Sequence, residues 1–278
     1  MASTLQGGMT KKEKSMFAII KGIKIYFDMF EKKGAPVVLL SHSLGSSHLM
    51  WDPQMDALKS YFQILRYDIR GHGESEVAQG PYTMEQLGEE AIGLLDHLGI
   101  EQVHWVGMSM GGMIGQAVAL NRPSRLKSLV LCDTTAIIPP EAQPVWQERI
   151  DQVRQKGMES QLEATMERWF TPFFLNSRPP ILSLIRQQFL STSVEGYVNC
   201  IEAIRRLNYL DRLSEIRIPT LILVGEDDPG TPVSASEAIH QRVPNSILKI
   251  IPSARHLSNV EQPELFNQHL LEFLKKHA

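Results

Sequence analysis

A serine stands between two glycines in the segment Gly107-Met108-Ser109-Met110-Gly111, which has the pattern G-x-S-x-G. The segment follows the apolar stretch 103–106 (VHWV) and precedes a stretch of mostly small residues, 111–120 (GGMIGQAVAL). A strand, a sharp turn and a helix in this order expose a serine hydroxyl above a sheet, and the start of the helix stabilises negative charge there. We therefore predict that Ser109 is a nucleophile and not a capping serine at a glycine-rich helix start.

The histidine that would activate this serine lies far along the chain. A serine hydroxyl is a weak nucleophile until a neighbouring base takes its proton, and serines on such turns have their acid and then their histidine downstream. His256 follows the apolar stretch 247–251 and a four-residue loop, a place where catalytic groups gather in open parallel sheets. His240, His269 and His277 lie in charged, helical surroundings instead. We therefore predict that His256 is the base.

An acid must orient that histidine by accepting a hydrogen bond from its second ring nitrogen. Three adjacent acids, residues 226–228, follow the apolar stretch 221–225 (LILVG). Asp228 is favoured because a Pro-Gly turn follows it. The pattern G-x-x-D-x-x-x-P around it is also common after the strand that carries the acid in proteins whose nucleophilic serine lies on a strand–turn–helix. Asp227 is the second candidate, and Asp133, at the end of an earlier apolar stretch, is the third.

The oxygen of a tetrahedral intermediate needs hydrogen-bond donors that are already in place. One predicted donor is the backbone N–H of Met110, directly after the serine, and the other is the N–H of Leu44 in the loop 41–45 (SHSLG). His42 is expected to brace this loop and not to serve as a second base, because it precedes the serine. His42 and Ser43 are also predicted to lie beside the substrate.

Strand-length apolar stretches alternate with helical patterns along most of the chain. This alternation is typical of the α/β class, with a mostly parallel sheet and helices on both of its faces. Thr83 and Gln86 have the spacing of a capping box, which begins one of the helices, and Gly99 fits its end. The predicted strands are 17–20 and 23–27, which form a hairpin, then 37–40, 62–67, 103–107, 126–132, 221–224 and 247–251, and the predicted helices are 84–98, 110–121, 234–242 and one from 263 onward.

Strands disappear between residues 136 and 214, where helical patterns and aromatic residues dominate. We interpret this segment as a helical cap inserted into one α/β core, which consists of residues 1–135 and 215–278 and begins with a flexible leader, residues 1–14. Most of the cap aromatics are expected to form a small core of their own. The cap residues predicted to contact the substrate are Trp146, Arg168, Trp169 and Phe170.

The bulk composition excludes several classes of function. The chain has 28 Lys and Arg residues against 31 Asp and Glu residues and no long basic run, so neither nucleic acid nor an anionic membrane is expected as a partner. No apolar stretch is long enough to span a membrane and the N-terminus lacks a signal-peptide core, so a cytoplasmic location is predicted. Cys132 and Cys200 are expected to be reduced and partly buried, and no metal ion or organic cofactor is expected. The sequence carries no signal for an oligomeric state.

With these residues assembled, the chain resembles the 3-oxoadipate enol-lactonases of aromatic-compound degradation, which have the α/β-hydrolase fold. The resemblance implies that fold and, as substrate, a small ester or lactone, namely a five-membered enol-lactone with a carboxymethyl group. Ser109 would attack the lactone carbonyl, His256 would protonate the leaving enolate, and water would release the acyl group. The resemblance rests on SLGSSHLMWDPQ (43–54), LRYDIRGHGES (65–75), GPYTMEQLGE (80–89), GMSMGGMIGQ (107–116), RWFTPFF (168–174) and HLSNVEQPE (256–264).

The resemblance also implies an anionic substrate, whose carboxylate would pair with a cation of the cap. Arg168, Arg205 and Arg206 are the candidates. The chain departs from the family pattern at His42, where the family usually has Asn, and in the basic and apolar stretch 203–213 (AIRRLNYLDRL). Both departures concern the choice of lactone and leave the hydrolase chemistry unchanged.

Two other functions fit parts of the pattern. A promiscuous carboxylesterase or lactonase that prefers short acyl or aryl esters would suit the aromatic, methionine-bearing cap. A binding or sensor protein would use the pocket without turnover, but the complete set of nucleophile, acid, base and oxyanion loop argues against this class. Dehalogenase chemistry is not expected, because it needs a carboxylate where this chain has Ser109.

Overall fold

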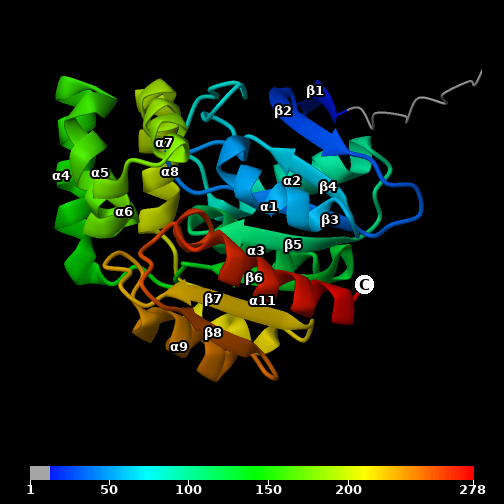
Figure 1. Cartoon of the computed structure of the whole chain (residues 1–278). Coiled ribbons are helices and arrows are strands. Elements are labelled where there is room, and N and C mark those ends of the chain that lie inside the picture. The colour runs from blue at the N-terminus through cyan, green and yellow to red at the C-terminus, as the bar shows by residue number, and fades with distance from the viewer. Residues whose placement is uncertain (1–12) are drawn as a thin grey trace, which may run out of the picture.

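An eight-stranded sheet runs through the molecule in the order β1-β2-β4-β3-β5-β6-β7-β8 (Figure 1). The computed structural model describes residues 13–278. Neighbouring strands are parallel except in the pairs β1–β2 and β2–β4, so the predicted mostly parallel sheet is confirmed. The strands are β1 (Glu13–Ile20), β2 (Ile23–Phe30), β3 (Val37–Ser41), β4 (Gln63–Tyr67), β5 (Val103–Met108), β6 (Leu126–Cys132), β7 (Thr220–Gly225) and β8 (Ile247–Ile251).

The central strands are mostly apolar because both faces of the sheet are covered. Every residue of β3, β5 and β7 is buried, which matches the continuous apolar runs in their sequences. β8 is an edge strand, and only its last residue, Ile251, is buried. The core therefore lies around the middle strands, and the loop 41–45, Ser109 and Asp228 follow the carboxyl ends of three of them, β3, β5 and β7.

The predicted hairpin at the start of the chain is confirmed. Lys21 and Gly22 connect β1 to β2 with φ values of 51° and 83°, the left-handed backbone that a tight hairpin turn requires. The predicted leader of residues 1–14 is too long, because Glu13 and Lys14 already pair with β2. Residues 1–12 lie outside the described residues.

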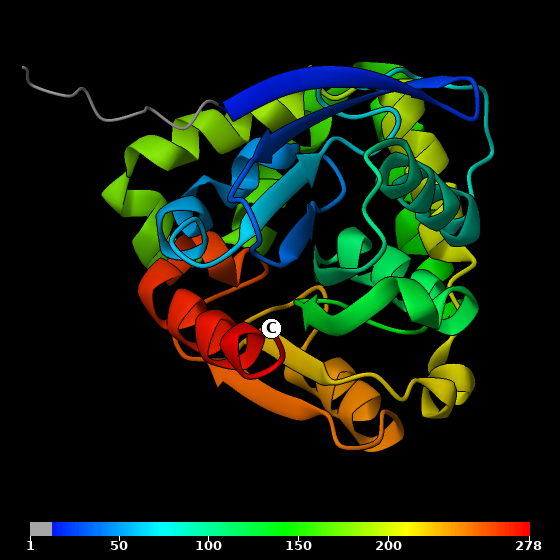
Figure 2. The same cartoon turned by 90° about the vertical axis from the view of Figure 1, so that its right-hand side faces the viewer.

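Helices cover both faces of the sheet (Figure 2). The capping box that begins α2 is confirmed, since Thr83 and Gln86 each accept a hydrogen bond from the other's backbone N–H at 3.1 Å. One face carries α2 (Met84–His97), α3 (Met110–Asn121) and α9 (Val233–Arg242), and the other carries α1 (Asp52–Leu58) and α11 (Pro263–Lys276), with the short α10 (Ser258–Glu261) before α11.

Between β6 and β7 the chain forms helices that gather on one side of the molecule (left in Figure 1). We refer to residues 136–214 as the cap, and its status as a separate domain stays a prediction. Trp169, Phe170 and Tyr197 are buried as expected of a cap core, whereas Phe173 is 85% exposed. The cap helices are α4 (Gln143–Lys156), α5 (Leu162–Trp169), α6 (Pro172–Ser177), α7 (Pro180–Ser191) and α8 (Val194–Arg205).

Two further expectations concern the described residues. The longest helices within residues 13–278 have 14 residues, and none is long and apolar enough to cross a membrane. Cys132 and Cys200 are both free thiols, and both are fully buried where the sequence analysis expected partial burial.

Candidate active site

Ser109 sits on the predicted sharp turn between β5 and α3. Its φ is 51°, an uncommon value for a residue with a side chain, and the turn is held by a hydrogen bond from its N–H to the carbonyl of Cys132 at 2.8 Å. A Cβ atom on Gly107 would lie 2.2 Å from the carbonyl oxygen of Gly111, and one on Gly111 would lie 2.2 Å from that of Ser41. The two glycines of the pattern are therefore required by close backbone contacts.

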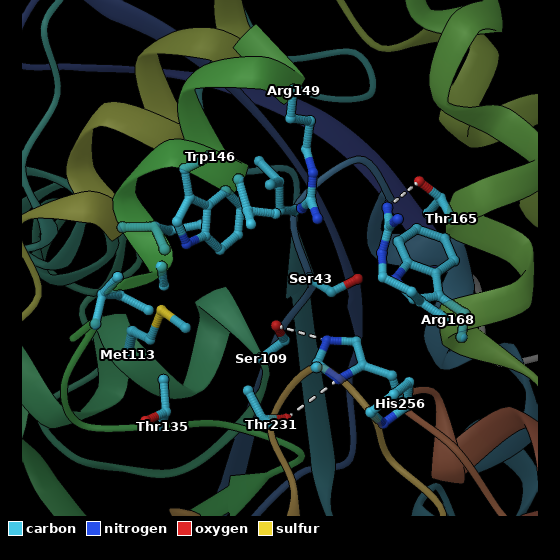
Figure 3. Close-up of a pocket in the computed structure, with 18 of the residues that line it drawn as sticks. Ser43, Ser109, Met113, Thr135, Trp146, Arg149, Thr165, Arg168, Thr231 and His256 are labelled. Atoms are coloured by element: carbon cyan, nitrogen blue, oxygen red, sulfur yellow. Dashed lines mark hydrogen bonds between the residues drawn. The ribbon is translucent and has the colours of Figure 1, made fainter. Parts of the chain in front are cut away.

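The structure brings Ser109, His256 and Asp228 together in a hydrogen-bonded row, although 147 residues separate the serine from the histidine. His256 Nε2 lies 2.9 Å from Ser109 Oγ, and His256 Nδ1 lies 2.8 Å from Asp228 Oδ2. Figure 3 shows the serine and the histidine meeting at the floor of a cavity. All three residues are at most 9% exposed, so the row is shielded from bulk water.

Electrostatics in the row favour a negative aspartate and a basic imidazole. Burial works against a charge on Asp228, but His256 and the hydrogen bonds from Thr231 outweigh it and hold the pKa of the carboxyl below its usual value. Burial also works against a charge on His256, but the charge of Asp228 and their hydrogen bond raise its pKa above the ordinary 6.5. This is the arrangement in which a carboxylate stabilises the imidazolium that forms during proton transfer.

The other two candidate acids lie elsewhere. Asp227 is exposed. Asp133 is fully buried, but its Oδ1 accepts a hydrogen bond from the N–H of Gly225 at 2.7 Å and its Oδ2 accepts one from Ser258 Oγ at 2.5 Å. Burial, and then the charge of Asp228, raise the pKa of Asp133 well above its usual value. Asp133 thus connects the end of β7 to the segment after His256 by hydrogen bonds, whereas Asp228 is hydrogen-bonded to the histidine itself.

Of the two predicted oxyanion donors, Met110 directly follows Ser109 in the chain and Leu44 belongs to a loop that lines the same cavity. Among the described residues, no hydrogen bond from the backbone N–H of Leu44 or of Met110 to another protein group is found, and Leu44 lines the cavity. His72 Nε2 accepts a hydrogen bond from the N–H of Gly45 at 2.9 Å, which fixes the loop that carries Leu44. Both N–H groups therefore remain the predicted donors for the oxygen of a tetrahedral intermediate.

His42 braces the loop as expected, but the prediction that it lies beside the substrate is not supported by the cavity lining. Its Nε2 accepts the N–H of Ile69 at 2.9 Å and its Nδ1 lies 2.8 Å from the carbonyl of Ser43, so both ring nitrogens are occupied. Burial lowers its pKa to about 4. Phe170 is also absent from the lining, because it is fully buried and its ring stacks on Phe174 at 4.7 Å.

A cavity of about 290 Å³ lies above Ser109 and is lined by both the core and the cap. Ser43, Trp146, Arg168 and Trp169, which the sequence analysis singled out, are in its wall. Arg149, Thr165 and Tyr197 are also in the wall and were missed, because no motif marks them. The apolar part of the lining includes Met113, Ile138, Val145 and Ile204.

The other two arginines proposed from the resemblance do not reach the cavity. Arg205 pairs with Glu202 at 3.2 Å, and Arg206 lies 4.0 Å from the same carboxylate with 56% of its side chain exposed. Arg205 is the last residue of α8 and Arg206 follows it; the preceding residue, Ile204, lines the cavity, but neither arginine does. As for metals, no group of three or more His, Cys, Asp or Glu side chains in the described part of the chain could hold an ion.

Comparisons with known proteins agree with this architecture. Residues 36–263 match the family described as "alpha/beta hydrolase fold". The 3-oxoadipate enol-lactonase 2 of Acinetobacter baylyi is 36% identical over 91% of this chain and 94% of its own. The enol-lactonase of Burkholderia xenovorans LB400 superposes with a TM-score of 0.90 at 35% identity, covering 94% of this chain and all of that one. A thermophilic esterase from Thermogutta terrifontis, solved with malate bound, has a TM-score of 0.88 at 32% identity, covering 95% of this chain and all of that one.

The predicted resemblance to the enol-lactonases is thereby confirmed, and so is the predicted fold class. The strand order, the serine turn and a match over most of the length lead to one conclusion: the chain belongs to the α/β-hydrolase family.

Proposed function

We propose that this protein is a serine hydrolase that opens a small carboxylated enol-lactone through an acyl-enzyme on Ser109. The observation that carries the proposal is the row Ser109–His256–Asp228 with distances of 2.9 and 2.8 Å at the floor of the cavity. The enol-lactonase names of two of its relatives support the substrate class.

The chemistry follows from the positions of these groups. His256 Nε2 takes the proton of Ser109 Oγ while the oxygen attacks the lactone carbonyl, and the N–H groups of Leu44 and Met110 hold the resulting oxyanion. The ring C–O bond then breaks, and the enolate oxygen leaves with the proton from His256. Water, deprotonated by the same histidine, attacks the acyl-enzyme carbonyl, and the proton returns to Ser109 as the carboxylate is released.

The side chain of Ser43 and the size of the cavity support binding of a small polar substrate. Ser43 Oγ is buried, lines the cavity and has no hydrogen-bond partner within the described residues, so its hydroxyl can donate to a substrate oxygen. A cavity of about 290 Å³ is at the small end of the range for ligand sites, about 300–1,000 Å³. Long acyl chains therefore fit poorly, whereas a five-membered ring with one short substituent fits well.

A second candidate function is a promiscuous carboxylesterase or lactonase for short acyl or aryl esters. The observation that favours it is the apolar wall formed by Met113, Ile138, Trp146 and Trp169, which can receive an uncharged group. The similarity to the Thermogutta terrifontis esterase also supports this second candidate function.

Initial rates on the enol-lactone and on 4-nitrophenyl acetate and butyrate separate the two candidates. We expect Ser109→Ala to abolish all activity and the lactone to lead by at least about a hundredfold in kcat/KM, roughly 2.7 kcal/mol of transition-state stabilisation. If the aryl esters lead instead, the protein is a general esterase. If Ser109→Ala retains wild-type rates, the serine mechanism is wrong.

A further inference from the structure

Two sequence stretches far apart in the chain meet where the cap joins the core. RWFTPFF (168–174) contains the end of α5 and the start of α6, and HLSNVEQPE (256–264) begins with His256 and contains α10. The backbone N–H of Leu257, directly after the histidine, donates a hydrogen bond to the carbonyl of Trp169 at 3.1 Å. The chain that carries the catalytic base is therefore attached to the cap.

Glu261 forms a second connection between the same two stretches. Its Oε1 accepts a hydrogen bond from the N–H of Thr171 at 2.9 Å and another from the hydroxyl of that residue. Its Oε2 accepts one from the N–H of Arg255, directly before His256, at 2.9 Å. The guanidinium of Arg255 also donates to the carbonyl of Glu167 in α5. One oxygen of Glu261 thus faces the cap and the other faces the backbone next to the base.

A carboxylate is the group that this position requires. Glu261 is only 9% exposed, and within residues 13–278 it forms no ion pair, so its charge is stabilised by the three hydrogen bonds that it accepts. A glutamine side chain has one oxygen and one NH₂ group, which would turn a donor toward one of the two backbone N–H groups. Only a carboxylate can accept hydrogen bonds from the cap and from the core at once.

The loop between β8 and α10, residues 252–257, is fixed on its core side as well. We refer to it as the histidine loop. The N–H of Asp227 donates to the carbonyl of Ala254 at 2.9 Å. A Cβ atom on Gly225, at the end of β7, would lie 2.3 Å from the carbonyl oxygen of Arg255. The histidine loop therefore lies between the sheet and the junction of α5 with α6, and a change at that junction alters its position.

The same junction also forms part of the cavity wall. The side chain of Trp169 lines the cavity, while its carbonyl accepts the hydrogen bond from Leu257. His256 Nε2 lies 2.9 Å from Ser109 Oγ, a distance that proton transfer requires. Displacement of a catalytic group by about 1 Å can lower a rate about a hundredfold. The hydrogen bonds around the histidine loop therefore bear directly on the rate.

We propose that Glu261 is a positioning residue for His256. By binding Thr171 of the cap and the N–H of Arg255 with its two oxygens, it holds the histidine loop at the distance from Ser109 that proton transfer needs. Glu261 does not touch the reacting atoms and acts only through the backbone beside the base. The proposal rests on the serine-hydrolase part of the proposed function and is independent of which ester or lactone is the substrate.

Steady-state kinetics with 4-nitrophenyl acetate test the proposal with two matched variants. Glu261→Gln should lower kcat at least about tenfold and change KM less than about twofold, because the base is displaced while the cavity remains. Glu85→Gln is the control. Glu85 in α2 also accepts a hydrogen bond from a cap hydroxyl, that of Tyr209 at 2.5 Å, but in the described part of the chain it is not hydrogen-bonded to the histidine loop. This control should keep the wild-type kcat.

A second set of variants changes the cap partner and leaves the carboxylate in place. Thr171→Val removes the hydroxyl and keeps the backbone N–H, so it should lower kcat by a smaller factor than Glu261→Gln. Thr171→Ser retains the hydroxyl and should keep the wild-type kcat. Tyr209→Phe, the matched control, removes the cap hydroxyl that binds Glu85 and should also keep it.

A further readout does not depend on turnover. The proton between His256 Nδ1 and Asp228 should give a ¹H NMR resonance far downfield of the amide region, which Asp228→Asn identifies by removing it. We expect Glu261→Gln to shift or broaden this resonance and Glu85→Gln to leave it unchanged. Circular dichroism shows that each variant is folded.

Several results would overturn the positioning role. These are an unchanged kcat and resonance in Glu261→Gln, a rise in KM without a fall in kcat, and equal losses in Glu261→Gln and Glu85→Gln, which would reflect a general loosening of the cap. The proposed function fails separately. Wild-type rates in Ser109→Ala together with an altered resonance in Glu261→Gln would reject the serine mechanism and uphold the positioning of His256.

Discussion

At the scale of single residues, two buried aspartates lie near His256 and only one of them contacts it. Asp228 Oδ2 is 2.8 Å from His256 Nδ1, whereas both carboxylate oxygens of Asp133 are hydrogen-bonded to Gly225 and Ser258. The two carboxyls also differ in charge, because their surroundings lower the pKa of Asp228 and raise that of Asp133. This contrast assigns different roles to two residues of the same type.

Matched substitutions test that assignment. Asp228→Asn should lower kcat by about 10³–10⁴-fold, because the histidine loses the carboxylate that stabilises its protonated form. Asp133→Asn should lower kcat less than about tenfold, because the amide oxygen can still accept from the N–H of Gly225 and the amide nitrogen can donate to Ser258 Oγ in place of the hydrogen bond that Ser258 now donates. Steady-state kinetics with 4-nitrophenyl acetate measure both effects. The reverse order of losses would make Asp133 the catalytic acid.

The raised pKa of His256 predicts the pH dependence of the reaction. The base must be neutral to accept the serine proton, so kcat/KM should fall as the pH decreases through the pKa of His256, with a midpoint above 6.5. Asp228→Asn removes the charge that raises this pKa and should move the midpoint of its residual activity to lower pH. A profile of kcat/KM between pH 5 and 9 measures both midpoints, and a wild-type midpoint below 6.5 would contradict the electrostatic account.

At the scale of elements, the start of α3 and the loop after β3 are in backbone contact. A Cβ atom on Gly111 would lie 2.2 Å from the carbonyl oxygen of Ser41 and 2.9 Å from that of His42. The two predicted oxyanion donors belong to these two segments, so their separation depends on this contact. Glycine at position 111 therefore serves the geometry of the site as well as the turn.

Gly111→Ala should consequently lower kcat by at least about a hundredfold, the loss that accompanies removal of one oxyanion donor. Gly88→Ala is the matched control, because Gly88 lies in α2 and its nearest neighbour would be a side-chain methyl of Val118 at 3.0 Å. The control should keep wild-type activity. Activity of both variants is measured on protein shown to be folded by circular dichroism, and equal rates would disprove the role of the contact.

At the scale of the whole molecule, a buried ion pair joins β2 to β4. Arg66 Nε donates to Asp28 Oδ1 at 2.9 Å and Nη2 donates to Oδ2 at 2.5 Å, and both residues are at most 5% exposed. Arg66 also reaches Asp52 at the start of α1. The pair therefore connects the antiparallel part of the sheet to a helix that covers it.

Arg66→Met should lower the free energy of unfolding by about 3–5 kcal/mol, because Asp28 would remain as a buried carboxylate without its partner. Arg122→Met, which breaks the exposed pair with Glu89, should change stability little. Urea unfolding followed by circular dichroism compares the two variants. A similar loss for both would show that burial does not determine the contribution of these pairs.

Much of the architecture could be predicted from the sequence because its signals are local. The capping box of α2, the Lys21-Gly22 hairpin and the run of buried strands each depend on residues close together in the chain, and all three are confirmed. The residues proposed as nucleophile, base and acid were chosen on similar grounds, since each follows a strand of a parallel sheet whose carboxyl ends meet at one edge.

The tertiary structure alone decided what surrounds those residues. Arg149, Tyr197 and Arg168 come from three different cap helices, and no spacing in the sequence indicates that they share one cavity. His42 and Phe170 lie beside lining residues in the sequence, yet packing turns both side chains into the interior. The sequence by itself thus determined where the strands, turns and reactive groups follow one another along the chain, because neighbouring residues encode them. Which helix faces line the cavity was decided only by packing between distant segments.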